Sequence, residues 1–327
     1  MRILVANVNT TSSMTDAIAA SARSVASLGT EIVGITPRFG PDSCEGNFES
    51  YLAALAVMDA VTSYPEPFDA VVQAGYGEHG REGLQELLDV PVVDITEAAA
   101  STAMYLGHRY SVVTTLDRAV PLIEDRLRLA GLDARCASVR ASGLGVLELE
   151  ADPERAVATI VAEARRAVEV DRAEVICLGC GGMAELEERV AAATGVPVVD
   201  GVRAAVAVAE GLVRLGLSTS KVRTYAPPRP KAVVGWPFAV PQSVPAPARN
   251  SSSRMLMTTA SAQPCPSRKA SRRRPSSRKP SESYSARARG LMLITARLTR
   301  WSPGPAPPSK AKRSTSPIAS RPYPRPR

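Results

Sequence analysis

The sequence is poor in the residues on which many binding and folding devices depend. Its 327 residues include two histidines, two tryptophans and five cysteines. An odd number of cysteines in a chain of this length does not form a disulfide framework. No second Cys/His pair joins Cys177 and Cys180 to complete a four-ligand zinc site. No apolar run reaches the roughly 20 residues of a membrane span, and the first residues lack the pattern of a signal peptide. We therefore expect a cytoplasmic protein with no membrane association and no metal.

Charge is divided unevenly along the chain. Of the 40 Lys and Arg residues, 19 lie in residues 241–327, where Glu282 is the only acid. This basic part is dense in proline, serine and arginine, and it has too little apolar surface to offset the entropy of folding. We therefore expect residues 236–327 to be a disordered tail. It is either an arm that binds nucleic acid or other polyanions non-specifically, or an extension without a selected role, as a change of reading frame would produce.

The part before the tail carries nearly the same sequence twice. Residues 90–99 (VPVVDITEAA) return as residues 196–205 (VPVVDGVRAA), so Asp94 and Asp200 correspond. Upstream of each copy an apolar run ends in small residues, at 71–77 and at 175–182. The repeat is far longer than the roughly 20–50 residues of a solenoid unit. It predicts two similar lobes that face each other.

Short apolar segments alternate with amphipathic ones in both halves, which predicts parallel sheets with crossover helices. The expected strands cover residues 3–6, 31–35, 70–73, 92–94, 110–114, 134–139, 174–178 and 198–200. The expected helices cover residues 14–28, 48–63, 80–88, 96–106, 119–130, 153–169, 184–194 and 202–215. Eight strands and eight helices would also suit a barrel, but the twofold repeat favours two open lobes.

The predicted fold class is therefore α/β, with two Rossmann-like lobes related by a pseudo-twofold axis and a four-stranded parallel sheet in each. We expect the first lobe to cover residues 1–97, completed by the helix at about 202–216, and the second to cover residues 98–201. Ligands of such sheets collect outside the carboxyl ends of the strands. The active site is therefore expected in the cleft between the lobes.

Cys180 is the main candidate for chemistry. It follows a predicted strand in the turn Gly179-Cys180-Gly181-Gly182, where glycines let a ligand approach the backbone closely. A helix is expected to begin just beyond this turn, and its N-terminus would favour a thiolate. Cys177 is expected to be a buried structural thiol inside the strand. The turn lacks the Lys-Ser/Thr of a P-loop and does not fit the dinucleotide fingerprint.

Further polar residues follow strand ends on the expected cleft side. They could bind carboxylate or ureido groups of a substrate, or serve only as turn and capping groups. The candidates for substrate binding are Asn7, Asn9, Thr10, Gly75, Tyr76, Thr114, Thr115, Gly181 and Gly182. Asp94 and Asp200 are expected to cap the helices that follow them, and His108 is expected on the surface.

Four segments resemble the aspartate/glutamate racemase superfamily and, within it, the hydantoin racemases. They are residues 3–11 (ILVANVNTT), the loop containing Gly40-Pro41 and Cys44-Glu45-Gly46, residues 111–121 (SVVTTLDRAVP) and residues 179–183 (GCGGM). The resemblance implies a racemase or epimerase without a cofactor, acting at a carbon next to a carbonyl in a hydantoin or amino-acid derivative. Two thiols, one in each lobe, would flank this small molecule and move protons on opposite faces. We also expect a homo-oligomer.

The chain departs from this pattern at Gly75, which the repeat aligns with Cys180. Glycine carries no proton, so the two-thiol mechanism cannot operate as written. One possibility is that a neighbour substitutes: His79 has a suitable unperturbed pKa near 6.5, with Tyr76 or Glu78 as further candidates. Alternatives are one-sided chemistry by Cys180, as in arylmalonate decarboxylases, and a binding protein without catalysis. If Gly75 marks a lost thiol, its α-carbon should face Cys180 across the cleft, and Gly75→Cys should create or strengthen racemisation, at little cost in stability if the backbone there tolerates a side chain.

Overall fold

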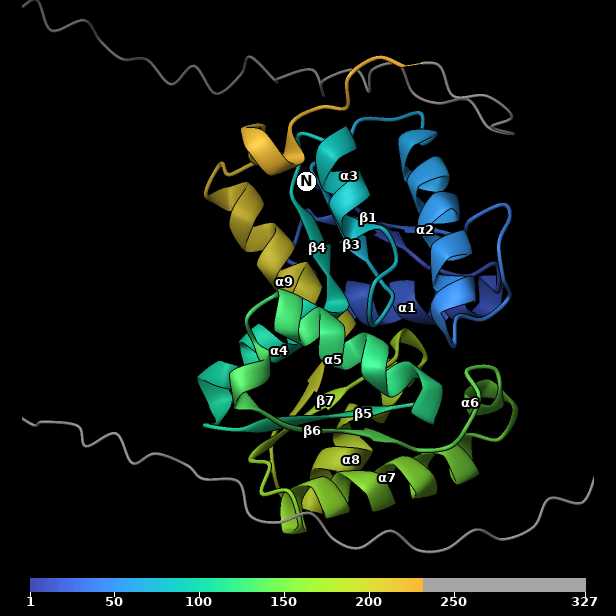
Figure 1. Cartoon of the computed structure of the whole chain (residues 1–327), viewed down its shortest axis with the longest axis vertical. Helices are drawn as coiled ribbons and strands as arrows, with labels where there is room; N and C mark the ends of the chain where they lie inside the picture. The colour runs from blue at the N-terminus through green and yellow to red at the C-terminus, as the bar shows by residue number, and fades with distance from the viewer. Residues whose placement is uncertain (232–327) are drawn as a thin grey trace, which may run out of the picture. The chain divides into compact units, whose positions relative to one another are not determined.

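A computed structural model of the chain describes residues 1–231, without the side chains of residues 184 and 185. The predicted tail at residues 236–327 lies outside this part. The described residues form two four-stranded parallel sheets with the strand orders β2-β1-β3-β4 and β6-β5-β7-β8 (Figure 1). The second order repeats the first, strand for strand. The predicted α/β fold with two similar lobes is confirmed, and the barrel alternative is wrong.

The elements lie close to where the sequence places them. The strands are β1 (Arg2–Ala6), β2 (Glu31–Ile35), β3 (Ala70–Gln73), β4 (Val92–Asp94), β5 (Tyr110–Thr114), β6 (Cys136–Ala141), β7 (Val175–Leu178) and β8 (Val198–Asp200). The α-helices are α1 (Ser12–Val25), α2 (Asn47–Thr62), α3 (Arg81–Leu87), α4 (Ile95–Leu106), α5 (Val120–Leu129), α6 (Glu148–Ala151), α7 (Pro153–Glu169), α8 (Glu187–Thr194) and α9 (Gly201–Arg214). Helix α6 was not predicted, and α1 ends at Val25 rather than at residue 28. Helix α8 begins at Glu187 rather than at residue 184 because it follows a 3₁₀ helix, η3 (Gly181–Leu186), where two consecutive glycines disfavour an α-helical start.

The strand order decides where loops can form a binding crevice. In the first sheet β1 lies between β2 and β3, so that Leu4 is paired with Val33 on one side and Val71 on the other. The chain therefore leaves β1 toward one edge of the sheet and leaves β3 toward the other. The same reversal occurs between β5 and β7 in the second sheet. Loops that diverge in this way leave a crevice at the carboxyl ends of the strands.

The two lobes share an apolar core. One cluster of buried side chains contains Ile3 and Val5 of the first sheet together with Val112 and Cys177 of the second. Two further clusters cover the outer faces of the sheets, one on each lobe. Strands buried on both faces explain why the sequence shows continuous apolar runs rather than strict alternation. The shared cluster therefore packs the two sheets against each other through one continuous set of apolar side chains.

The repeated motif brings two helix starts together. Asp94 caps α4 and Asp200 caps α9, each accepting the backbone N–H groups two and three residues further on. The first helical residues, Ile95 and Gly201, are equivalent in the repeat. A Cβ at position 201 would lie 2.7 Å from the backbone oxygen of Ile95. The glycine in the second copy is therefore the residue that allows α4 and α9 to pack closely.

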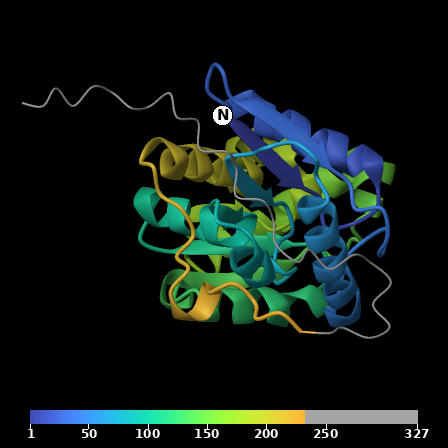
Figure 2. The same cartoon turned by 90° about the horizontal axis from the view of Figure 1, so that it is seen from above.

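Each of these helices also contacts the sheet of the opposite half. Helix α4 follows the first sheet in sequence but packs against β7 and β8, whereas α9 follows the second sheet and packs against α1 and β3. Figures 1 and 2 show α9, in dull gold, beside the blue first lobe. Glu210 of α9 accepts the backbone N–H of Ser27 at 2.8 Å and the hydroxyl of Thr30 at 2.6 Å. The exchange of helices ties the lobes together.

Some apolar side chains remain on the surface. Phe48, Tyr51 and Leu52 are exposed near the start of α2. Within residues 1–231, no helix is long and apolar enough to cross a bilayer. The predicted homo-oligomer stays a prediction.

We predict opposite effects for two Gly→Ala changes in α9. Gly201→Ala should lower the free energy of unfolding by about 1–3 kcal/mol, because the new methyl group overlaps the Ile95 carbonyl. Gly211→Ala is the matched control, since a Cβ there has no neighbour within 4 Å, and it should stabilise the helix by about 0.5–1 kcal/mol. Urea denaturation of both variants measures the difference. Equal effects of the two changes would contradict the close contact at Gly201.

Candidate active site

A cavity lies where the carboxyl ends of β1, β3, β5 and β7 meet. Its volume is about 40 Å³. Four strand-end loops supply most of its lining: Asn7, Val8 and Asn9 after β1; Ala74, Gly75, Tyr76 and His79 after β3; Thr114 and Thr115 at β5; and Gly179, Cys180 and Gly181 after β7. All of the predicted site residues except Thr10 and Gly182 line it. The cavity thus brings together residues of both lobes, as the inter-lobe cleft requires.

Cys180 lies at the start of η3 and contacts apolar side chains of two core clusters. Burial raises the pKa of its thiol to about 11, although a hydrogen bond from the backbone N–H of Gly182 acts in the opposite direction. The expected thiolate is therefore not the resting form, because the cost of removing the charge from water outweighs the one backbone donor. At neutral pH Cys180 is a protonated thiol that can donate its proton.

The space beside Gly75 is filled by its neighbours. A Cβ at position 75 would lie 2.3 Å from Cδ2 of His79, 2.5 Å from Cγ1 of Val8 and 3.0 Å from Nε2 of Gln73. The imidazole of His79 therefore occupies the volume that a side chain at position 75 would need. Gly75 and Cys180 line the same cavity, and a side chain at position 75 requires His79 and Val8 to shift.

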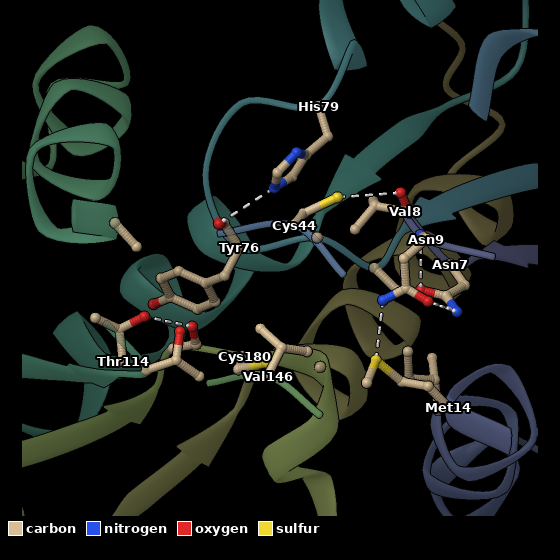
Figure 3. Close-up of a pocket in the computed structure, with 17 residues that line it drawn as sticks. Asn7, Val8, Asn9, Met14, Cys44, Tyr76, His79, Thr114, Val146 and Cys180 are labelled. Atoms are coloured by element: carbon tan, nitrogen blue, oxygen red, sulfur yellow. Dashed lines mark hydrogen bonds between the residues drawn. The ribbon is translucent and has the colours of Figure 1, made fainter. Parts of the chain in front are cut away.

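The surroundings of His79 define its protonation state. Its side chain is buried, and Nε2 lies 3.4 Å from the backbone oxygen of Tyr76 (Figure 3). A carbonyl oxygen can only accept, so Nε2 carries the hydrogen and Nδ1 keeps a lone pair. Within the described part of the chain, Nδ1 has no hydrogen-bond partner. Burial, with the charge of Arg126 adding to it, lowers the pKa of His79 to about 4. The ring is neutral near pH 7.

Several predicted substrate-binding residues use their polar groups to hold the turns in shape. Asn7 donates to Asn9 at 2.9 Å and to Thr15 at 3.0 Å. Asn9 in turn donates to the sulfur of Met14 at 3.1 Å, as the dashed line in Figure 3 marks. The hydroxyl of Thr114 donates to the backbone oxygen of Gly179 at 3.0 Å. These side chains shape the cavity wall.

The two predicted residues outside the cavity lining lie close by. The hydroxyl of Thr10 donates to the backbone oxygen of Pro41 at 3.3 Å, which fixes the loop after β2. Gly182 stands beside Cys180 and contributes the backbone N–H that bonds its sulfur.

Eight lining residues were not predicted from the sequence, and two of them, Cys44 and Val146, come from loops that do not follow the strands β1, β3, β5 or β7. Cys44 comes from the loop before α2, donates to the backbone oxygen of Val8 at 3.3 Å, and has a pKa raised to about 12 by burial. Val146 comes from the loop before α6 in the other lobe, and its backbone N–H donates to Glu45 at 2.9 Å. Cys44 lies in one of the segments that resemble the hydantoin racemases. Its sequence surroundings did not indicate that its loop would reach the site.

The contact between Glu45 and Val146 joins loops of the two lobes at the cavity, because Val146 itself and Cys44, the neighbour of Glu45, both line it.

The remaining candidates have structural positions. Cys177 is fully buried inside β7, and His108 is exposed. Burial raises the pKa of Cys177 far above its usual range. Among the described residues, no group of three or more His, Cys, Asp or Glu side chains is arranged to hold a metal ion.

The fold and the cavity define a class of protein in which two equivalent α/β lobes share one site at the carboxyl ends of their strands. The family model for Asp/Glu/hydantoin racemases matches residues 3–209, and the chain belongs to this family. A hydantoin racemase of Pseudomonas sp. (strain NS671) is 42% identical over 236 residues, which are 72% of this chain and 95% of the relative.

Solved structures agree with this assignment. The crystal structure of an allantoin racemase from Pseudomonas fluorescens has 75% sequence identity and a TM-score of 0.71, and the match covers 72% of this chain and all of that one. An allantoin racemase from Klebsiella pneumoniae has 40% identity and a TM-score of 0.70, with 72% and 96% covered. The protein is therefore an isomerase of the racemase type.

We predict that Gly75→Ala inactivates the enzyme although the change adds only one methyl group. The methyl would overlap the His79 ring and displace it, and a displacement of about 1 Å costs roughly 100-fold in rate. Racemisation rate and the NMR signals of His79 should both change, whereas Gly211→Ala should alter neither. Full activity of Gly75→Ala would show that the space beside Gly75 is not needed by His79.

A second prediction concerns the titration of His79. Nitrogen NMR should show His79 as the Nε2–H tautomer with a pKa of about 4. Because the folded pKa of His79 is lower than that of the unfolded chain, protonation favours unfolding. The contribution of His79 to stability is therefore complete above about pH 6.5 and is lost as the pH falls toward 4. A His79 signal that titrates near pH 6.5 would contradict its burial.

Proposed function

We propose that this racemase inverts the ring carbon beside a carbonyl in 5-substituted hydantoins, with Cys180 and His79 as the proton carriers on opposite faces. One observation carries this proposal: the His79 ring fills the position beside Gly75, where the repeat would otherwise place the counterpart of Cys180. The scaffold thus keeps two proton carriers although the sequence has only one of the two thiols.

The substrate class rests on the relatives. The relatives described above are a hydantoin racemase and two allantoin racemases. Hydantoins and allantoin share a five-membered ring whose stereocentre lies between a carbonyl and a ring nitrogen. The carbonyl makes the hydrogen on that carbon acidic, because the negative charge that remains can move onto oxygen. We therefore infer that the enzyme recognises the five-membered ring. The candidate substrates, 5-substituted hydantoins and allantoin, differ in the substituent at the stereocentre.

The resting protonation states suit proton transfer across the ring. Near pH 7 the buried thiol of Cys180 holds a proton and the buried imidazole of His79 holds a lone pair. For one enantiomer, His79 takes the proton from carbon and Cys180 donates its own proton to the opposite face. The products of this step are an imidazolium, a thiolate and the inverted substrate.

The opposite enantiomer uses the second form of the enzyme, in which Cys180 is a thiolate and His79 is protonated. Both forms carry the same number of protons, so the reaction is reversible without an external acid or base. The enolate exists only between the two transfers, and a site that excludes water strengthens every interaction with it.

The position of His79 favours this two-sided mechanism over the alternatives. A one-sided enzyme of the arylmalonate decarboxylase kind needs only Cys180, and a binding protein needs neither proton carrier. In this chain an imidazole with an unpaired nitrogen lines the same cavity as the thiol. The cytoplasmic location and the homo-oligomer remain predictions.

We predict that Cys180→Ser and His79→Asn each lower the rate of inversion by about 10²–10⁴-fold, the usual contribution of a general acid or base. In D₂O, Cys180→Ser should still exchange the ring hydrogen of the enantiomer that faces His79. His79→Asn should exchange that of the enantiomer that faces Cys180, at a rate that rises with pH because only the thiolate of Cys180 removes a proton. The enantiomer that exchanges should differ between the two variants. Enantiopure 5-substituted hydantoins and allantoin are the probes, with uncatalysed exchange subtracted.

Cys177→Ser is the matched control, because it removes a thiol three residues away that lies inside β7. It should leave the ratio of the two exchange rates unchanged. Inversion at the wild-type rate in His79→Asn would refute the role of the histidine, and exchange of the same enantiomer in both variants would refute their placement on opposite faces.

A further inference from the structure

A buried arginine joins the two lobes beside the proposed histidine. Arg126 lies on α5, after β5 of the second lobe, and its side chain is 1% exposed. Its guanidinium reaches four carboxylates from residues 78–97: Glu78 at 3.0 Å, Glu82 at 2.5 Å, Asp94 at 3.1 Å and Glu97 at 2.7 Å. Removing such a group from water is costly unless partners surround it. The four carboxylates therefore hold Arg126 in one place.

One of the four partners belongs to the turn that carries His79. Glu78 accepts from Arg126 with one carboxylate oxygen at 3.0 Å and from the backbone N–H of Gly80 with the other at 2.7 Å. His79 stands between these two residues in the chain. The other side of the turn is held by Thr96, whose hydroxyl accepts the backbone N–H of Gly77 at 2.9 Å. Arg126 thus holds the histidine turn through Glu78.

The cluster around Arg126 contains more carboxyl groups than positive charges, which affects the pKa values of Glu78 and Glu82. Two cations, Arg81 and Arg126, face four carboxyl groups in the cluster. Burial and a hydrogen bond with Glu82 raise the pKa of Glu78. Burial acts in the same direction on Glu82, but hydrogen bonds with Glu78 and Arg126 outweigh it and lower the pKa of Glu82. The pair can therefore share one proton, and both members remain bonded to Arg126.

The segment of the second lobe that leads from β5 into α5, the helix of Arg126, also borders the cavity. Thr114, Thr115 and Ala119 line it, and α5 begins at the next residue, Val120. Movement of this segment would therefore change the cavity wall and the anchor of the histidine turn together.

We propose that Arg126 is a positioning residue, which acts through Glu78 to set the place of the His79 ring relative to the cavity and Cys180. This inference rests on the proposed function of His79 as a proton carrier. It assigns to Arg126 and Glu78 no contact with the substrate. Their effect is on geometry, to which proton transfer is sensitive because a displacement of about 1 Å can cost 100-fold in rate.

Two matched variants test the proposal in the full-length enzyme. Glu78→Gln keeps an oxygen for the N–H of Gly80 but turns an NH₂ group, which cannot accept a hydrogen bond, toward Arg126. Glu82→Gln changes a partner that lies closer to Arg126, but Glu82 lies on α3 and is not part of the turn. Glu78→Gln should lower kcat about tenfold and change KM less than about twofold, because positioning acts on the chemical step.

The diagnostic measurement is deuterium exchange of each enantiomer of a 5-substituted hydantoin. Glu78→Gln should slow exchange of the enantiomer that faces His79, and should leave the one that faces Cys180 within about twofold, since only the histidine turn has moved. Glu82→Gln should leave the ratio of the two rates unchanged. The nitrogen NMR signals of His79 should shift in the first variant and not in the second.

Arg126→Lys provides a second route to the same result if Glu78→Gln does not fold. Lysine keeps the positive charge but lacks the planar fork that reaches several carboxylates at once, so it should give the same unequal loss of exchange. Equal loss for both enantiomers, or the same effect from Glu78→Gln and Glu82→Gln, would overturn the positioning role. Failure of the proposed function is distinguishable, because His79→Asn would then invert the substrate at the wild-type rate.

Discussion

The close contact between the starts of α4 and α9 is the constraint on which the rest of the molecule depends. Asp94 and Asp200 cap these helices in equivalent ways, and the backbone of Ile95 passes within reach of a Cβ that Gly201 lacks. Each helix then covers the sheet of the other half. This exchange brings the carboxyl ends of four strands together. Without it the loops after β1, β3, β5 and β7 would not form one cavity.

The two lobes have nearly the same fold but contribute different functional groups to the site, an imidazole from the first lobe and a thiol from the second. Gly75 and Cys180 are equivalent in the repeat, but only one of them carries a side chain. The missing side chain leaves room for the His79 ring, which reaches the cavity from four residues further along. Burial affects the two groups in opposite directions, lowering the pKa of His79 to about 4 and raising that of Cys180 to about 11. Both effects follow from the same cost of placing a charge away from water.

The buried charges show how the lobes keep these groups in place. An isolated arginine in the interior would be strongly unfavourable, and four carboxylates from the first lobe compensate it. One of them, Glu78, stands next to His79, so the same contact that joins the lobes also reaches the site. The bond from the backbone N–H of Val146 to Glu45 also joins loops of the two lobes beside the cavity.

How much could be read from the sequence differs between the backbone and the site. The repeated VPVVD motif and the apolar runs before it predicted the two sheets, because strands buried on both faces need apolar residues at every position. The same motif predicted the aspartate caps, which depend only on neighbours two and three residues away. Cys180 was predicted as a strand-end thiol, and the family resemblance indicated a racemase.

Tertiary structure alone decided which groups meet and how they ionise. The overlap of His79 with the space beside Gly75, the position of Cys44 and the bond from Arg126 to Glu78, 48 residues away, depend on how loops cross after folding. The sequence suggested a thiolate at Cys180, but burial in the shared core made the neutral thiol the stable form. Local patterns determine elements because their hydrogen bonds are local, whereas pKa values and cavity walls depend on contacts between distant segments.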